Sequence, residues 1–223
     1  MQTVEYAPGR LADVFGDQGQ PTVLLWHGMQ TDARAAVRTL AGLVADRGLA
    51  VVAPDWNSQA DDDGRDDLLR SARFAQQWGL RSEGLVVVGW SMGGLAAAGL
   101  AIAADRLAIR VRHTICLAGA FTATDPIFGN VPARALPDVE PGPPFTLLHG
   151  AADDVVPVSA SRDFAGELLR YGWQAEFVEI DADHASIACA RYDPVAGQYS
   201  AADDVETISV ATDVVARIAA ALD

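Results

Sequence analysis

A serine lies in a glycine-rich segment whose spacing is typical of a catalytic nucleophile. The segment reads Gly89-Trp90-Ser91-Met92-Gly93-Gly94 and fits the pattern G-x-S-x-G. An apolar run at 85–88 precedes it and a run rich in small residues at 91–104 follows it. The serine is therefore expected on a sharp strand-to-helix turn, where the backbone is strained and the hydroxyl is exposed. Glycine is needed at positions 89 and 93, because side chains there would collide with the neighbouring helix and strand.

A serine hydroxyl needs a base before it can attack a carbonyl carbon. The chain has four histidines, and three of them stand at the ends of apolar runs, namely His27, His113 and His149. His184 instead follows the run at 175–180, in Asp181-Ala182-Asp183-His184. A loop in that place is expected at the same edge of a sheet as Ser91, so His184 is the candidate base.

A histidine base needs a carboxylate to fix its tautomer and to stabilise its charged form. The segment after the apolar run at 145–148 carries Asp153 and Asp154, and either can supply that group. Asp125 is a weaker candidate. With Asp153 or Asp154 the chain order is serine, aspartate, histidine.

The negative oxygen formed during acyl transfer needs two backbone N–H donors. The residue after the nucleophile, Met92, is expected to supply one, and Met29, after His27-Gly28, the other. Four apolar side chains are candidates for the wall of a substrate pocket, and each could equally belong to the core: Trp90, Phe121, Ile127 and Phe128.

These residues must be positioned by alternating strands and helices. Strands are expected at 22–26, 49–53, 85–88, 113–117, 145–148 and 175–180, and helices at 33–47, 65–78, 91–104, 159–171 and 204–222. Asp32 is expected to cap the first helix. Strands without polar alternation, separated by helices, predict an α/β fold with a mostly parallel sheet covered on both faces. The first twenty residues are expected to add one or two antiparallel edge strands, with Pro8-Gly9 as the turn.

One segment departs from this alternation. Residues 119–144 contain six prolines, so they are expected to form neither a long helix nor a long strand. The segment leaves the carboxyl edge of the sheet, where ligands bind in open parallel sheets, so it is expected to insert near the site as one wall of a pocket.

Composition narrows the class of protein. The 223 residues suit a single domain, 1–223, and the net charge of −14 disfavours a nucleic-acid partner. Every basic residue is arginine, which excludes mechanisms built on a lysine. Two cysteines are too few for a disulfide framework, and no apolar run approaches the roughly 18 residues of a membrane span. With no signal-peptide pattern at the start, we expect a cytoplasmic protein, monomeric or weakly dimeric, without a membrane partner.

With these motifs in place, the chain from Val23 to its end resembles the α/β-hydrolase superfamily, and more narrowly its small lidless carboxylesterases and dienelactone-hydrolase-like members. The strongest part is His149-Gly150 through Asp153 to Val156-Pro157, which is similar to the HGxxDxxVP segment of small carboxylesterases and acyl-protein thioesterases. In that segment the aspartate is the acid of the triad, so the resemblance selects Asp153 over Asp154. One departure is Asp181-Ala182-Asp183, where the family usually has glycines before its histidine.

The resemblance implies an α/β-hydrolase fold without a large lid and a serine hydrolase of small carboxylic esters. Ser91 would be the nucleophile, His184 the base and Asp153 the acid, with no metal or cofactor. Dienelactone hydrolases have cysteine at the position of Ser91, and haloalkane dehalogenases have aspartate there. The alternatives are a thioesterase or small peptidase on the same triad, or a ligand-binding protein that kept the fold and lost turnover.

Overall fold

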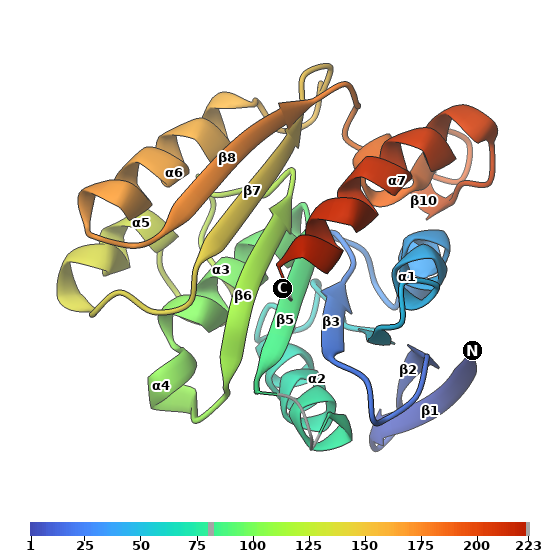
Figure 1. Ribbon diagram of the computed structural model, residues 1–223, viewed down its shortest axis with the longest axis horizontal. Coiled ribbons are helices and arrows are strands. Elements are labelled where there is room, and N and C mark those ends of the chain that lie inside the picture. Colours follow the sequence, from blue (N-terminus) through green and yellow to red (C-terminus); the bar gives the residue numbers. More distant parts are fainter. Residues whose placement is uncertain (80–82, 222–223) are drawn as a thin grey trace.

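A mostly parallel sheet of eight strands forms the centre of the computed structural model, which describes residues 1–79 and 83–221 (Figure 1). The strand order is β1-β2-β4-β3-β5-β6-β7-β8. The strands are β1 (Gln2–Ala7), β2 (Arg10–Phe15), β3 (Thr22–Trp26), β4 (Ala50–Pro54), β5 (Leu85–Trp90), β6 (Val111–Leu117), β7 (Phe145–Gly150) and β8 (Ala175–Ile180). The six predicted parallel strands and the antiparallel β1–β2 edge are thus confirmed.

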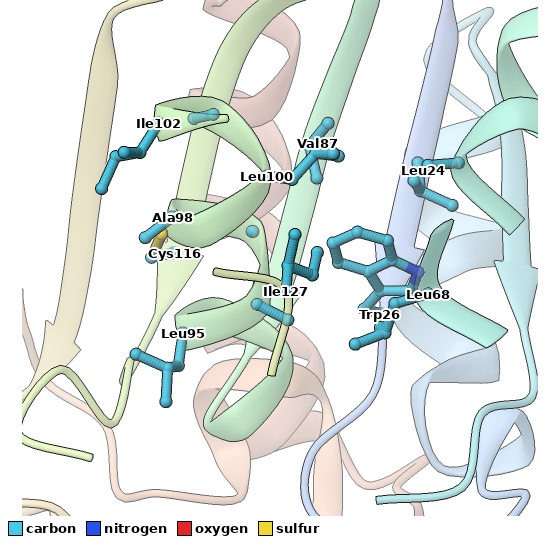
Figure 2. Packing of buried hydrophobic residues seen from close by; sticks show 14 of the residues in the cluster. Leu24, Trp26, Leu68, Val87, Leu95, Ala98, Leu100, Ile102, Cys116 and Ile127 are labelled. Carbon is cyan, nitrogen blue, oxygen red and sulfur yellow. The ribbon is translucent and has the colours of Figure 1, made fainter. Parts of the chain in front are cut away.

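Helices cover both faces of the sheet. The longer ones are α1 (Arg38–Ala45), α2 (Arg65–Trp78), α3 (Met92–Ile102), α6 (Ser159–Arg170) and α7 (Val205–Ala220). Side chains of α2, α3 and α6 share one hydrophobic cluster, and those of α1 and α7 share the cluster on the opposite face. Successive residues of β3 alternate between the two clusters, as Leu24 and Leu25 do, so both faces of the strand are apolar. Figure 2 shows the first cluster, with Trp26 of β3 close to Leu68 of α2.

The helix expected at 33–47 begins differently from the prediction. A 3₁₀ turn, Arg34–Val37, precedes α1, and Asp32 caps neither. Asp32 has a φ of +53°, and its carboxylate lies 2.7 Å from the Arg10 guanidinium. The cap prediction for Asp32 is wrong because this ion pair to β2 takes the carboxylate away from the helix.

The last helix, expected at 204–222, is capped by the first residue of that range. Asp204 accepts a hydrogen bond of 2.9 Å from the N–H of Thr207. The final residue of the predicted range, Leu222, lies outside the described residues. Among the described residues, no helix is long and apolar enough to cross a membrane.

Several short elements were not expected. The sequence predicted no structure between His184 and α7, but a 3₁₀ turn, η3 (Ser186–Ala188), and a hairpin of β9 (Ala190–Asp193) and β10 (Gln198–Ala201) lie there. In residues 119–144, which were expected to form no long helix or strand, α5 (Pro132–Ala135) and η2 (Leu136–Asp138) are each a single turn. After α3 the chain makes one more short helix, α4 (Ala104–Leu107).

Candidate active site

Ser91 occupies the turn between β5 and α3, with a φ of +56° and a ψ of −117°. A non-glycine residue in this region of backbone space is strained by about 1–3 kcal/mol, so its surroundings must hold it there. A Cβ on Gly89 would overlap the carbonyl oxygen of Gly93, and a Cβ on Gly93 would overlap that of His27. The two glycines therefore allow strand and helix to approach closely enough to form the turn, as their spacing predicted.

The structure brings Ser91, His184 and Asp153 into one hydrogen-bonded row. His184 Nε2 lies 3.0 Å from Ser91 Oγ, and His184 Nδ1 lies 2.8 Å from Asp153 Oδ2. A carboxylate can only accept, so Nδ1 carries the proton and Nε2 is left to accept from the serine hydroxyl. The side chains of His184 and Asp153 are 4% and 0% exposed. This arrangement can move a proton from Ser91 to His184 while the carboxylate stabilises the resulting charge.

Asp153 is ionised in spite of its burial. Burial by itself raises the pKa of the Asp153 carboxyl, but hydrogen bonds from His149, His184 and the N–H groups of Val155 and Val156 together hold it well below its usual range. The two N–H groups lie 2.9 and 2.8 Å from Oδ1, which leaves Oδ2 to face the histidines. A negative charge next to His184 is thus maintained throughout the neutral range of pH.

The other two candidate acids lie elsewhere. Asp154 is exposed at the mouth of the pocket described below. Asp125 is buried against α3, where a Cβ on Gly99 would overlap its carboxylate. Burial raises the pKa of Asp125 to about 6, although the N–H groups of Ile127 and Phe128 oppose this shift. Of the three aspartates, Asp153 is the one in contact with His184.

Asp183 closes the turn before His184 with its side chain, at a position where the sequence comparison had expected glycine. Its Oδ1 accepts hydrogen bonds of 2.9 and 2.7 Å from the N–H groups of Ala185 and Ser186. The hydroxyl of Ser186 accepts in return from the N–H of Asp183, at 2.9 Å. This reciprocal pair closes the turn that carries His184. The same loop passes so close to β7 that a Cβ on Gly150 would overlap the carbonyl oxygen of Ala182.

Trp90 also fixes the histidine loop. Its indole N–H donates to the carbonyl oxygen of His184 at 2.7 Å, and its ring lies 5.6 Å from the imidazole, centroid to centroid. Trp90 is 2% exposed, yet it lines the pocket beside Ser91. It therefore serves both the pocket wall, as expected from the sequence, and the position of His184.

The N–H groups of Met29 and Met92 are free in the part of the chain that the structure describes. Met92 is the first residue of α3, where N–H groups have no partner within the helix. Met29 follows Gly28, whose Cα lies so near the nucleophile that a Cβ on it would come within 3.3 Å of Ser91 Cβ. Both amides thus lie on segments adjoining Ser91.

His27 organises the loop that carries Met29. Its Nε2 accepts from the N–H groups of Ala33 and Trp56, at 3.2 and 3.3 Å, and its Nδ1–H donates to the carbonyl oxygen of Gly28 at 2.8 Å. Burial lowers the pKa of His27 to about 4, with the hydrogen bond to the Gly28 carbonyl as a smaller opposing effect. The imidazole is therefore neutral near pH 7, as an acceptor at Nε2 must be.

A pocket of about 780 Å³ opens over the Ser91 hydroxyl. Its wall is built by the end of β5, by residues after β3, β5, β7 and β8, by the β9–β10 hairpin and by the first turn of α7. They are Gly28, Met29, Trp90, Ser91, Asp154, Val155, Asp183, His184, Ala185, Ser186, Ala190, Arg191, Tyr192, Tyr199 and Thr207. The N–H of Tyr199 donates to the Gln30 side chain at 2.7 Å, which ties the hairpin to the Met29 loop. Tyr199 also contacts Trp90, edge to face, with ring centroids 4.8 Å apart.

Residues 119–144 do not form the expected wall, and Phe121, Ile127 and Phe128 are not among the residues lining the pocket. Phe121 stacks on Phe164 of α6, with ring centroids 4.3 Å apart. Ile127 belongs to the cluster that contains Trp26 and Leu100 (Figure 2). The ring of Phe128 lies under the Arg106 guanidinium. Phe121 and Ile127 gain more from burial with side chains of α3 and α6 than they would in a wet pocket, which is why the segment packs on these helices.

Sequence reasoning missed the hairpin and its tyrosines. A signal was present, because polar and apolar residues alternate at 190–193 and 198–201 on either side of Pro194 and Gly197. Each run is only four residues long, too short to stand out beside the buried strands. No cluster of three or more His, Cys, Asp or Glu side chains suited to a metal ion occurs among the described residues.

Comparison with known proteins gives a likeness in structure but none in sequence. No protein-family model matches the chain, and neither does any curated protein. The apo form of esterase 2 from Thermogutta terrifontis superposes with a TM-score of 0.73 at 19% identity, covering 97% of this chain and 94% of that one. Its propionate-bound form gives 0.71 at 20% identity over the same shares. An inhibited form of esterase B from Lactobacillus rhamnosis gives 0.70 at 14% identity, over 95% and 82%. Together with the strand order and the turn at Ser91, these superpositions show that the chain has the α/β-hydrolase fold.

Proposed function

We propose that the protein is a serine hydrolase that cleaves small carboxylic esters through an acyl-enzyme intermediate. The observation that carries the proposal is the row from Ser91 through His184 to Asp153, which opens on a pocket from a strained turn. A purely structural contact between His184 and Asp153 would not require Ser91 to be held beside them in a strained backbone conformation, with a φ of +56°. The solved structures compared above are named as esterases, and one of them holds propionate.

In the proposed mechanism, Ser91 Oγ attacks the ester carbonyl carbon while His184 Nε2 takes its proton. The N–H groups of Met29 and Met92 donate to the negative oxygen of the tetrahedral intermediate. Collapse of this intermediate breaks the bond to the alcohol, which leaves with the proton from His184. Water then repeats the sequence on the acyl-enzyme, with His184 as base, and releases the acid and free Ser91.

The pocket supports short or compact substrates. Residues 119–144, the longest segment between neighbouring strands that could have formed a lid, pack on α3 and α6 instead. Each buried methylene contributes only about 0.8 kcal/mol, and only where a wall can cover it. We therefore expect catalytic efficiency to peak at acyl chains of roughly two to six carbons, where Trp90 and Tyr199 can still cover them.

Hydrolysis of p-nitrophenyl esters from acetate to palmitate, with acyl-CoA thioesters and a peptide p-nitroanilide beside them, tests the proposal. Ser91→Ala should lower kcat on the best ester by a factor on the order of 10⁶, because the three side chains act as a unit. A fluorophosphonate should label Ser91 in the wild type, as located by mass spectrometry. Higher efficiency on thioesters or anilides would make the protein a thioesterase or peptidase. An unreactive Ser91 would leave the ligand-binding alternative.

A further inference from the structure

A second histidine contacts the same carboxylate as His184. His149, the penultimate residue of β7, is fully buried. Its Nε2 lies 3.2 Å from Asp153 Oδ2 and 2.9 Å from the carbonyl oxygen of Val156. Its Nδ1 lies 2.7 Å from Ser161 Oγ. The row that ends at Ser91 therefore extends back through Asp153 to His149 and to Ser161 on α6.

The partners of His149 determine where its proton lies. The carbonyl oxygen of Val156 and the Asp153 carboxylate can only accept, so Nε2 must carry the hydrogen that both share. In the neutral ring, Nδ1 then has a free lone pair, and the hydroxyl of Ser161 can donate to it. Ser161 is buried as well, so its hydroxyl needs a hydrogen-bond partner within the protein. Ser161 thus favours the tautomer in which His149 donates toward Asp153.

His149 completes the set of donors around the carboxylate. Two backbone N–H groups fix Oδ1, and the imidazoles of His149 and His184 face Oδ2. Without His149, the Asp153 carboxylate keeps the two hydrogen bonds to Oδ1 but loses a contact at Oδ2. The carboxylate is then freer to rotate away from His184. A small rotation matters, because misplacing a catalytic group by about 1 Å can cost about 10²-fold in rate.

Resting on the proposed ester hydrolysis, we propose that His149 is a positioning residue for the reaction. It holds the Asp153 carboxylate in the orientation that His184 needs, and Ser161 keeps His149 in its donating tautomer. His149 does not reach the pocket, and its action passes through Asp153 alone.

Four variants test the role. His149→Phe keeps a flat ring but removes both nitrogens, and it should lower kcat about 10- to 100-fold with KM within about twofold of wild type. His149→Gln keeps an N–H donor of similar reach and should recover at least half of that loss on a logarithmic scale. Ser161→Ala should lower kcat about two- to fivefold. His113→Phe is the matched control, since it removes another strand histidine, bonded to Thr146, and should leave kcat within about twofold.

A proton spectrum provides a readout that needs no substrate. The Nδ1–H of His184, held against a buried carboxylate, should give a low-field resonance in the wild type and in His113→Phe. In His149→Phe this resonance should broaden or vanish as the bond to Asp153 loosens. If the wild type hydrolyses no ester, the proposed function fails while this spectrum still decides the role of His149.

Several outcomes overturn the inference. A His149→Phe protein that folds with more than half of the wild-type kcat, or that keeps the resonance unchanged, would do so. Equal losses in His149→Phe and His149→Gln would show that the donor does not matter. If His149→Phe does not fold, Ser161→Ala decides, and an unchanged kcat in that variant refutes the proposal.

Discussion

The two sides of the catalytic row are held by different means. Ser91 is fixed by backbone sterics, because Gly89 and Gly93 let β5 and α3 close around it. His184 and Asp153 sit in loops after β8 and β7 and are fixed by polar side chains, notably Asp183 and His149. The serine side is therefore sensitive to added volume, and the histidine side to lost hydrogen bonds. This difference gives four predictions, from the largest expected effect to the smallest.

Replacing the acid tests the histidine side most directly. Asp153→Asn keeps the shape but offers an N–H where His184 needs an acceptor, which favours the wrong tautomer. We expect kcat to fall about 10³- to 10⁴-fold. Asp154→Asn, next in the chain and exposed, is the control and should cost less than about tenfold. Steady-state kinetics on the best ester measures both, and the reverse ranking would assign the acid to Asp154.

The serine side should fail when volume is added. Gly93→Ala places a Cβ against the carbonyl oxygen of His27, a backbone atom that cannot move aside alone, so we expect a loss of about 3 kcal/mol in unfolding free energy. Gly42→Ala makes the same change within α1, where a Cβ meets nothing within 4 Å. That variant should gain about 0.5–1 kcal/mol. Urea denaturation compares the two variants, and equal effects would show that the turn at Ser91 does not depend on the absence of a side chain at position 93.

The buried His27, whose carbonyl oxygen lies against Gly93, makes the unfolding free energy depend on pH. Its folded pKa is about 4, against an ordinary value of 6.5. Between these values the unfolded chain binds a proton that the folded chain does not, so the unfolding free energy falls as pH is lowered from 6.5 toward 4. The loss amounts to about 3 kcal/mol over the window. His27→Gln should remove this slope in urea denaturation across pH.

Asp125 changes the unfolding free energy in the opposite direction as pH is lowered. Its raised pKa of about 6 lets the folded chain bind a proton at a pH where the unfolded chain does not. Its contribution is the same in wild type and in His27→Gln, so the difference between their slopes isolates His27. Identical slopes would mean that His27 is protonated as readily in the folded as in the unfolded chain.

The smallest effect is expected at the turn before His184. Asp183→Ala removes the acceptor for the N–H groups of Ala185 and Ser186 and should loosen the base, lowering kcat about fivefold. Asp181→Ala removes an equal charge two residues away and should leave kcat within about twofold. A drop of the same size in both would indicate an effect of charge rather than of the turn.

The sequence by itself determined the sheet, the turn at Ser91 and the serine–aspartate–histidine order. These features are local: apolar runs without alternation define buried strands, and Gly89 and Gly93 carry their steric requirement in their identity. For the same reason the edge hairpin at Pro8-Gly9 could be predicted.

Tertiary structure alone decided the surroundings of the row. Residues far apart in the chain meet there, as in the hydrogen bond from the Trp90 indole N–H to the carbonyl oxygen of His184, and no spacing rule specifies which polar group will face which. Phe121 and Ile127 could serve a pocket or a core equally well by their chemistry, and only the surface offered by α3 and α6 placed them inside. Tyr199, in a hairpin of short strands, lines the pocket instead. Four-residue strands are not stable by themselves, and this hairpin is held by the contact of Tyr199 with Trp90 and by its hydrogen bond to Gln30.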